Sequence, residues 1–338
     1  MESMKLPRDK GRELWIDYIK GMCMVGIIMF HINPSLGYSP YLVSWFLAGF
    51  FFTGGYTFRL YGGFKEFFIR KFRYLVVPVF SFGILNLLLS LVAKDISFIR
   101  RIEGIFFQLP GRDDDMWFVA CLFVMEMISY VIVRFIKDYR LRIFACLALL
   151  AAGWCWKDYV DIPLPWHLVT ACMMIIFVGL GYEAKRVDLY RHLKDFVVQR
   201  SGKSIAAGLL LIYLLLAWHW DNVVDIHLLN YGKTIYFYLL ALISLPVLFM
   251  ICIMLESVFG SLFCKSIKYI GVNSLAYYGM QSKVITIVIT AGMYIGLPAS
   301  TVPMVIVYTF IVLLILAPLS YFINRFMPFM LGRAYKKK

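Results

Sequence analysis

Long apolar runs separated by short polar stretches repeat along the whole chain. A membrane-spanning helix needs about 20 mostly apolar residues, and the pattern predicts about ten such helices. Their expected ranges are 14–33, 41–60, 74–93, 116–134, 142–157, 164–182, 204–220, 234–255, 269–292 and 304–324. The predicted fold class is therefore all-α, a polytopic integral membrane bundle of about ten transmembrane helices in a single domain over residues 1–338.

Composition supports a membrane protein. The chain is 62% hydrophobic and 16% charged, whereas soluble domains are about 45–50% apolar and about 25% charged. The net charge of +14 does not indicate nucleic acid, because the basic residues lie in short loops and form no stripe with interleaved aromatic residues. The seven cysteines occur singly without Cys or His spacing typical of zinc, so neither a metal site nor a disulfide framework is expected.

The distribution of lysine and arginine predicts the topology. Cytoplasmic loops of membrane proteins carry an excess of these residues, and most of the 34 fall on the side of the N-terminus when sides alternate along the chain. The opposite side holds six: Lys94, Arg100, Arg101, Arg112, Lys157 and Lys233. We therefore expect both termini in the cytoplasm and the basic C-terminal tail beside anionic lipids.

Ionisable residues inside predicted spans are costly and are functional candidates by default. Lys20 and His31 of the first span differ by three turns and about 20°, so they share a face about 16.5 Å apart along the axis. Asp17 lies near that face and could pair with Lys20. The arrangement suits a long ligand whose charged end meets Lys20 and whose reactive end meets His31. Snorkelling of Lys20 and an ordinary interior histidine are the alternatives.

Further polar residues extend this set. Glu126 lies near the middle of the fourth span and is expected either to orient His31 or to form a structural ion pair with Lys283. Arg70 and Arg73 share a helix face at the cytoplasmic end of the third span and could grip a phosphate, although topology alone also favours arginine there. His219 and His227 could contact an acceptor, but they are more often ordinary interface histidines.

Several segments together resemble the membrane acyltransferase-3 family of sugar O-acyltransferases, and the fucose-4-O-acetylase-like branch is the most similar. The segments are Lys20-x10-His31, "FFFTGGY" ending at Tyr56, Arg70-x-x-Arg73, "MWFVACLF" (116–123) and "IKYIGVNSLAYYGMQ" (267–281). Three positions depart from the family pattern: Lys20 replaces the commoner arginine, Gly54 a common serine, and Gln281 the usual late histidine.

The resemblance implies a membrane-bound O-acyltransferase. It would move an acyl group, expected to be acetyl, from cytoplasmic acyl-CoA to a sugar hydroxyl of a cell-envelope or exported glycan. Together with the reasoning from individual residues, it assigns catalytic roles to His31 and Glu126, and donor binding to Lys20, Arg70, Arg73 and Asp17. Gln281 and Tyr56 are expected to support the site. Lys283 is a further supporting candidate that the family pattern itself does not imply. Direct transfer and an acyl-histidine intermediate both fit.

The expected partners are acyl-CoA, a carbohydrate or lipid-linked sugar, and membrane lipids, with acetyl-CoA as a donor substrate and no permanently bound cofactor. The expected location is the bacterial cytoplasmic (inner) membrane. A proton-coupled secondary transporter of a sugar or lipid-linked intermediate is the main alternative. The absence of visible inverted repeats disfavours it.

Overall fold

The computed structural model describes residues 13–92, 98–111, 115–220, 224–258 and 261–334. Within these ranges the regular elements are helices, and the one β-bridge joins Asp225 to Asn230. The helices are α1 (Leu14–Ile32), α2 (Pro40–Tyr56), α3 (Phe64–Lys71), η1 (Phe72–Val76), α4 (Val77–Val92), α5 (Phe98–Phe107), α6 (Trp117–Phe135), α7 (Tyr139–Cys155), η2 (Trp156–Val160), η3 (Pro165–His167), α8 (Leu168–Arg186), α9 (Leu189–Val198), α10 (Arg200–Trp218), α11 (Thr234–Val258), α12 (Ser261–Val272), α13 (Ser274–Tyr294), α14 (Val302–Phe326) and η4 (Pro328–Leu331).

The protein is an all-α polytopic membrane bundle, as its sequence predicts. Eight of the described helices are long and apolar enough to cross a membrane. The other two expected spans correspond to α2, which has 17 residues, and to α13, which carries several polar residues. Each of the ten expected ranges thus contains a helix over most of its length.

The helix boundaries differ from expectation in two ways. The third helix begins at Phe64 rather than near residue 74, because α3 continues into α4 through the π-helical turn η1. Three helices were not predicted: α5, α9 and α12. They are too short or too polar to cross a membrane, so a search for apolar runs of about 20 residues passes over them.

Glycines bring pairs of helices into close contact. A Cβ atom on Gly55 of α2 would lie 1.9 Å from the carbonyl oxygen of Val178 in α8, and one on Gly181 would lie 2.0 Å from that of Phe52. Gly21 of α1 and Gly271 of α12 approach the facing backbone equally closely. Small residues at such positions allow membrane helices to pack backbone to backbone. Of the glycine pair in "FFFTGGY", Gly55 is therefore explained by backbone packing.

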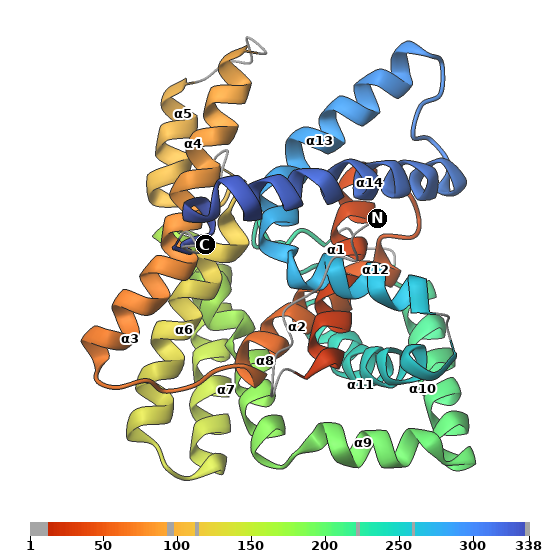
Figure 1. Ribbon diagram of the computed structural model, residues 1–338. Coiled ribbons are helices and arrows are strands. Elements are labelled where there is room, and N and C mark those ends of the chain that lie inside the picture. The colour runs from red at the N-terminus through yellow and green to blue at the C-terminus, as the bar shows by residue number, and fades with distance from the viewer. Residues whose placement is uncertain (1–12, 93–97, 112–114, 221–223, 259–260, 335–338) are drawn as a thin grey trace.

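The arrangement in Figure 1 separates the two ends of α1. Helices α6, α7 and α8 lie side by side, α5 lies against α4 at the top, and α9 lies at the bottom. Trp15, at the start of α1, stacks on Tyr190 of α9 with ring centroids 5.2 Å apart. The start of α1 therefore belongs to the end of the molecule that α9 covers, and His31 lies at the other end of the helix.

Candidate active site

His31 lies in the last turn of α1, with its residue exposed while neighbouring Ile28 and Ile32 are buried. Its ring meets Phe30 edge to face, with centroids 5.7 Å apart. The ionisable groups that act on the ring are Asp225 and His227. His31 is thus an accessible imidazole with a carboxylate and a second imidazole nearby.

A folded connection between α10 and α11 carries these two neighbours. Its backbone closes through the Asp225–Asn230 bridge, with N–H···O distances of 2.8 and 2.9 Å. The amide of Leu228 also donates to Asp225 Oδ1 at 3.3 Å. Val224, Ile226 and Tyr231 of the same segment are buried in the core. Because the segment is hydrogen-bonded and anchored, Asp225 and His227 are held in fixed positions.

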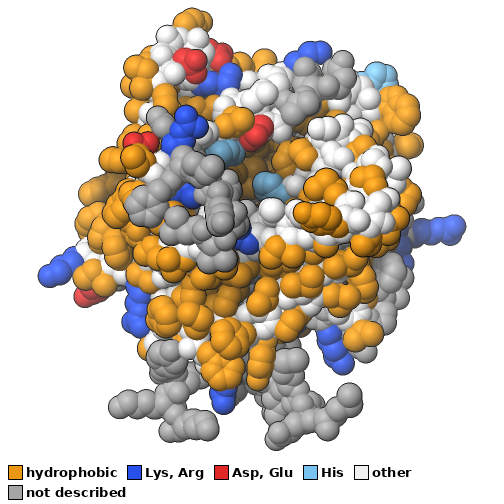
Figure 2. Space-filling model, turned by 90° about the horizontal axis from the view of Figure 1, so that it is seen from above, with side chains coloured by type: hydrophobic (Ala, Val, Ile, Leu, Met, Phe, Trp, Pro, Cys, Tyr) orange, Lys and Arg blue, Asp and Glu red, His pale blue; other side chains and the backbone are white. Residues whose placement is uncertain are grey.

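We define a histidine cluster near this end of α1 as His31, His167, His227, Trp117 and Asp225. The Trp117 ring, at the start of α6, lies 5.2 Å from the ring of His167 and 5.5 Å from that of His227. The rings of His167 and His227 are 5.4 Å apart. Figure 2 shows histidine side chains in a hollow on one face of the molecule. Among the described residues, no three His, Cys, Asp or Glu side chains are arranged to hold a metal ion.

Glu126 does not join this cluster, and the expectation that it contacts His31 or Lys283 is wrong. Its buried carboxylate forms an ion pair with Lys71 at the end of α3, with Nζ 2.7 Å from Oε1. Lys20 is the second cation that acts on the same carboxylate. Two cations from α1 and α3 therefore converge on a glutamate of α6. Lys71 was not predicted because its contact depends on how α3 docks against α6.

The predicted donor residues occupy two environments. Asp17 is buried near Lys20 in α1. Arg70 and Arg73 are exposed, and the Arg70 guanidinium lies 4.0 Å from the centre of the Tyr61 ring. The structure therefore places Lys20 and Lys71 beside the buried Glu126 and leaves both arginines at the surface. Their roles in donor binding stay predictions.

Two of the predicted supporting residues, Lys283 and Tyr56, contact residues outside the histidine cluster. Lys283 Nζ donates to Ser90 Oγ at 2.9 Å, which ties α13 to α4. Gln281, in the same helix, is buried. Tyr56 meets Trp15 edge to face at 4.8 Å, at the start of α1. Tyr56 is therefore separated from His31 by most of the length of that helix.

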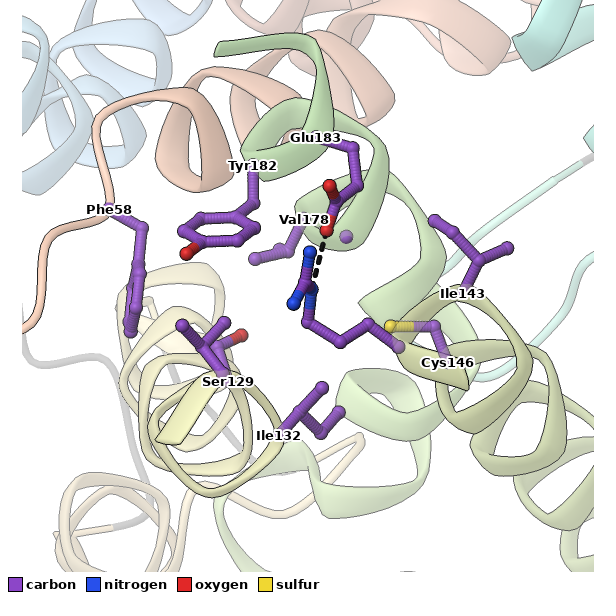
Figure 3. Close-up of a pocket in the computed structure, with 11 residues that line it drawn as sticks. Phe58, Ser129, Ile132, Ile143, Cys146, Val178, Tyr182 and Glu183 are labelled. Atoms are coloured by element: carbon purple, nitrogen blue, oxygen red, sulfur yellow. Dashed lines mark hydrogen bonds and ion pairs between the residues drawn. The ribbon is translucent and has the colours of Figure 1, made fainter. Parts of the chain in front are cut away.

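A small cavity lies between α6, α7 and α8 (Figure 3). Arg142 Nε donates to Glu183 at 2.6 Å, and Arg142 Nη1 donates to the carbonyl oxygens of Ile136 and Lys137. The guanidinium thus joins the α6–α7 connection to α8. Its charge is neutralised by Glu183, and the other lining residues are mainly apolar, so we assign this cavity to helix packing.

Comparison with protein families identifies the chain. The family model for an acyltransferase domain of the acyltransferase-3 type matches residues 13–322. The chain belongs to the acyltransferase-3 family. It is thus a multi-pass membrane acyltransferase. No curated protein and no solved structure matches it closely enough to count as similar. The resemblance to the fucose-4-O-acetylase-like branch stays a prediction.

Part of the histidine cluster is not predicted by the sequence. The sequence gives no reason to select Asp225 or His167, and it favours an ordinary interface or loop role for His227. All three lie at helix ends or in a connection, where hydrophobic periodicity carries no information about facing residues. The local sequence "DIH" after a tryptophan-rich helix end was the available signal, and it is weak.

Proposed function

We propose that this acyltransferase moves an acyl group, acetyl in the first instance, from cytoplasmic acyl-CoA to a sugar hydroxyl of a cell-envelope or exported glycan. One observation carries the proposal: His31 lies at one end of α1, within electrostatic range of Asp225 and His227. Lys20 lies on the same helix face about 16.5 Å away. The helix therefore offers a reactive group at one end and a cation toward the other.

The chemistry needs a base that works near neutral pH, and histidine is the usual one. The sugar hydroxyl gives its proton to a ring nitrogen of His31 while its oxygen attacks the thioester carbonyl carbon. The carbon–sulfur bond breaks, and the sulfur leaves as the CoA thiol after receiving that proton. In the two-step alternative, the ring nitrogen attacks the thioester first and an acyl-histidine then passes the group to the sugar.

Asp225 has a defined part in either route. A carboxylate beside an imidazole stabilises the imidazolium that forms when the ring accepts a proton. The bridge to Asn230 and the hydrogen bond from the Leu228 amide hold the Asp225 backbone and side chain in place. We therefore assign Asp225 to charge stabilisation and keep His31 as the group that meets the reacting atoms.

The donor would enter from the side of α3 and α9. CoA is an anion, and the cations on that path are Lys20 and Lys71, with Arg70 and Arg73 at the surface. An extended pantetheine arm could follow the face of α1 from Lys20 to His31. In this proposal both termini lie in the cytoplasm, and the acceptor lies on the outer side of a bacterial inner membrane.

Labelled transfer tests the proposed function. Inverted membrane vesicles with and without the protein are given acetyl-CoA that carries a radioactive acetyl group, and the glycan fraction is then isolated. We expect label in the glycan when the protein is present, released by mild base as expected for an O-ester. Equal label in both vesicle preparations would contradict the proposal.

A further inference from the structure

His227 is a second imidazole near the end of α1 that carries His31. It acts electrostatically on His31, and its residue is partly exposed. The connection that carries His227 is closed by the Asp225–Asn230 bridge and is anchored by the buried side chain of Ile226. His227 is therefore a fixed and partly accessible group in the region where His31 would meet its substrates.

The His227 ring packs against two other rings from different elements. Its centroid lies 5.5 Å from that of Trp117, at the start of α6, and 5.4 Å from that of His167, at the end of η3. The Trp117 and His167 rings are themselves 5.2 Å apart, so the three rings form one packed group. Groups that stabilise a transition state work best when they are oriented in advance. The packing of His227 meets that requirement.

The backbone that places His167 is strained. Trp166 and His167 are consecutive residues with φ of +58° and +52°, in the left-handed region that residues other than glycine seldom adopt. His167 is 1% exposed, and the Trp166 ring packs against Phe80 of α4 and Phe123 of α6 at 6.3 and 5.9 Å. Such conformations persist only where the surrounding structure enforces them, and they cluster at functional sites. The strained turn thus supports His227 through His167.

Acyl transfer from a thioester needs a hydrogen-bond donor as well as a base. When the sugar oxygen attacks, the thioester carbonyl oxygen becomes an anion, and a fixed N–H group aimed at that anion lowers the barrier. In the proposed reaction His31 becomes an imidazolium, which the Asp225 carboxylate stabilises. A second imidazolium nearby would repel the first, whereas a neutral imidazole still carries one N–H group. Neutral His227 therefore has the properties of the required donor.

We propose that the ring N–H of His227 donates a hydrogen bond to the carbonyl oxygen of the acyl thioester and stabilises the oxyanion, and that His167 is a positioning residue for this ring. The proposal rests on the proposed function, since it requires a thioester donor. The sugar hydroxyl proton moves to His31 as the new carbon–oxygen bond forms, and the oxyanion accepts the hydrogen bond from His227. When the carbon–sulfur bond breaks, the sulfur takes the proton from His31, and the His227 N–H stays in place. Attack by His31 itself creates the same oxyanion, so the role also holds in the two-step route.

A donor analogue isolates this hydrogen bond. In acetyl-dithio-CoA a sulfur replaces the carbonyl oxygen, and because sulfur is a weak acceptor, the analogue gains little from the N–H group. The measured quantity is the initial rate of free CoA release in inverted vesicles with equal amounts of each variant, corrected for vesicles without the protein. Removing one oxyanion donor typically lowers the rate about 10²–10³-fold. We expect His227→Leu to lose about that factor with acetyl-CoA and much less with the analogue, so the ratio of the two rates falls by about tenfold or more.

Three further variants make the result specific. His227→Gln keeps an N–H donor and should lose less activity with acetyl-CoA than His227→Leu. His167→Leu should lower the ratio in the same direction, because it releases the His227 ring. His219→Leu is the matched control, and it should change neither rate, because His219 is exposed at the end of α10. An unchanged ratio in His227→Leu would overturn the proposal, whether both rates stay normal or fall together, since a structural role alone affects both donors equally.

Free CoA release reports transfer to any acceptor, so the two proposals can fail separately. If release shows the His227 effect while no labelled acetyl group reaches the glycan, the glycan acceptor fails and the role of His227 stands. If labelled glycan forms while the ratio is unchanged in His227→Leu, the role of His227 fails and the proposed function stands. Absence of protein-dependent release with acetyl-CoA would contradict both.

Discussion

The ionisable residues that the sequence singles out lie in two different environments. His31 is exposed beside Asp225 and His227, whereas Glu126 is buried against Lys71. The sequence suggests that His31 and Glu126 act together, because both are ionisable residues inside predicted spans. It could not tell that Glu126 faces α3, because the rotation of α6 about its axis is set by packing with its neighbours.

The Lys71–Glu126 pair gives a prediction for stability. Breaking a buried ion pair by removing one partner typically costs about 3–5 kcal/mol. Lys71→Met should therefore lower the melting temperature of the detergent-solubilised protein clearly, and Lys71→Met with Glu126→Leu should recover most of the loss. Arg70→Met is the matched control, since Arg70 directly precedes Lys71 in the chain and its residue is exposed. Equal melting temperatures for Lys71→Met and Arg70→Met would contradict the buried pair.

The exposed arginines give a prediction for donor binding. Losing a charge-assisted hydrogen bond to a phosphate typically costs about 1.5–3 kcal/mol, which is about ten- to a hundredfold in affinity. Arg70→Ala and Arg73→Ala should each raise the KM for acetyl-CoA by up to that factor and leave the protein inserted. An unchanged donor KM in both variants would show that these arginines serve topology alone.

At the scale of elements, the sequence predicts the long apolar helices well, because about 20 apolar residues in succession have few alternatives in a membrane. It does not predict α5, α9 and α12, nor that α3 and α4 form one long helix. Those features depend on contacts with neighbouring helices, such as the stacking of Tyr190 in α9 on Trp15. The position of the α10–α11 connection near His31 likewise depends on tertiary packing.

Close packing of α2 on α8 gives a prediction for one glycine. Gly55→Ala would place a methyl group 1.9 Å from the Val178 carbonyl oxygen, so the two helices must separate. Overpacking of this kind typically costs about 1–3 kcal/mol. Gly208→Ala in α10 is the matched control, because no atom lies within 4 Å of the added carbon. We expect a lower melting temperature for Gly55→Ala and an unchanged or higher one for Gly208→Ala.

For the whole molecule, the family assignment and the helical bundle agree with the sequence, whereas the orientation in the membrane stays a prediction. Reporter fusions test it. A reporter at residue 338 should report the cytoplasm, and a reporter inserted after Gly111 should report the outer side, because the excess of lysine and arginine favours that arrangement. Reporters that indicate the same side would contradict it.

The central claim is that His31 is the base for acyl transfer. His31→Gln keeps a hydrogen-bonding side chain but removes the imidazole, and loss of a general base typically lowers the rate about 10²–10⁴-fold. His219→Gln is the matched control, since His219 is exposed at the end of α10 and its ring bonds the Leu215 carbonyl oxygen. The measurement is the initial rate of labelled acetyl transfer in vesicles with equal amounts of each protein. We predict a loss of at least a hundredfold for His31→Gln and an unchanged rate for His219→Gln, and near-normal transfer by His31→Gln would contradict the account.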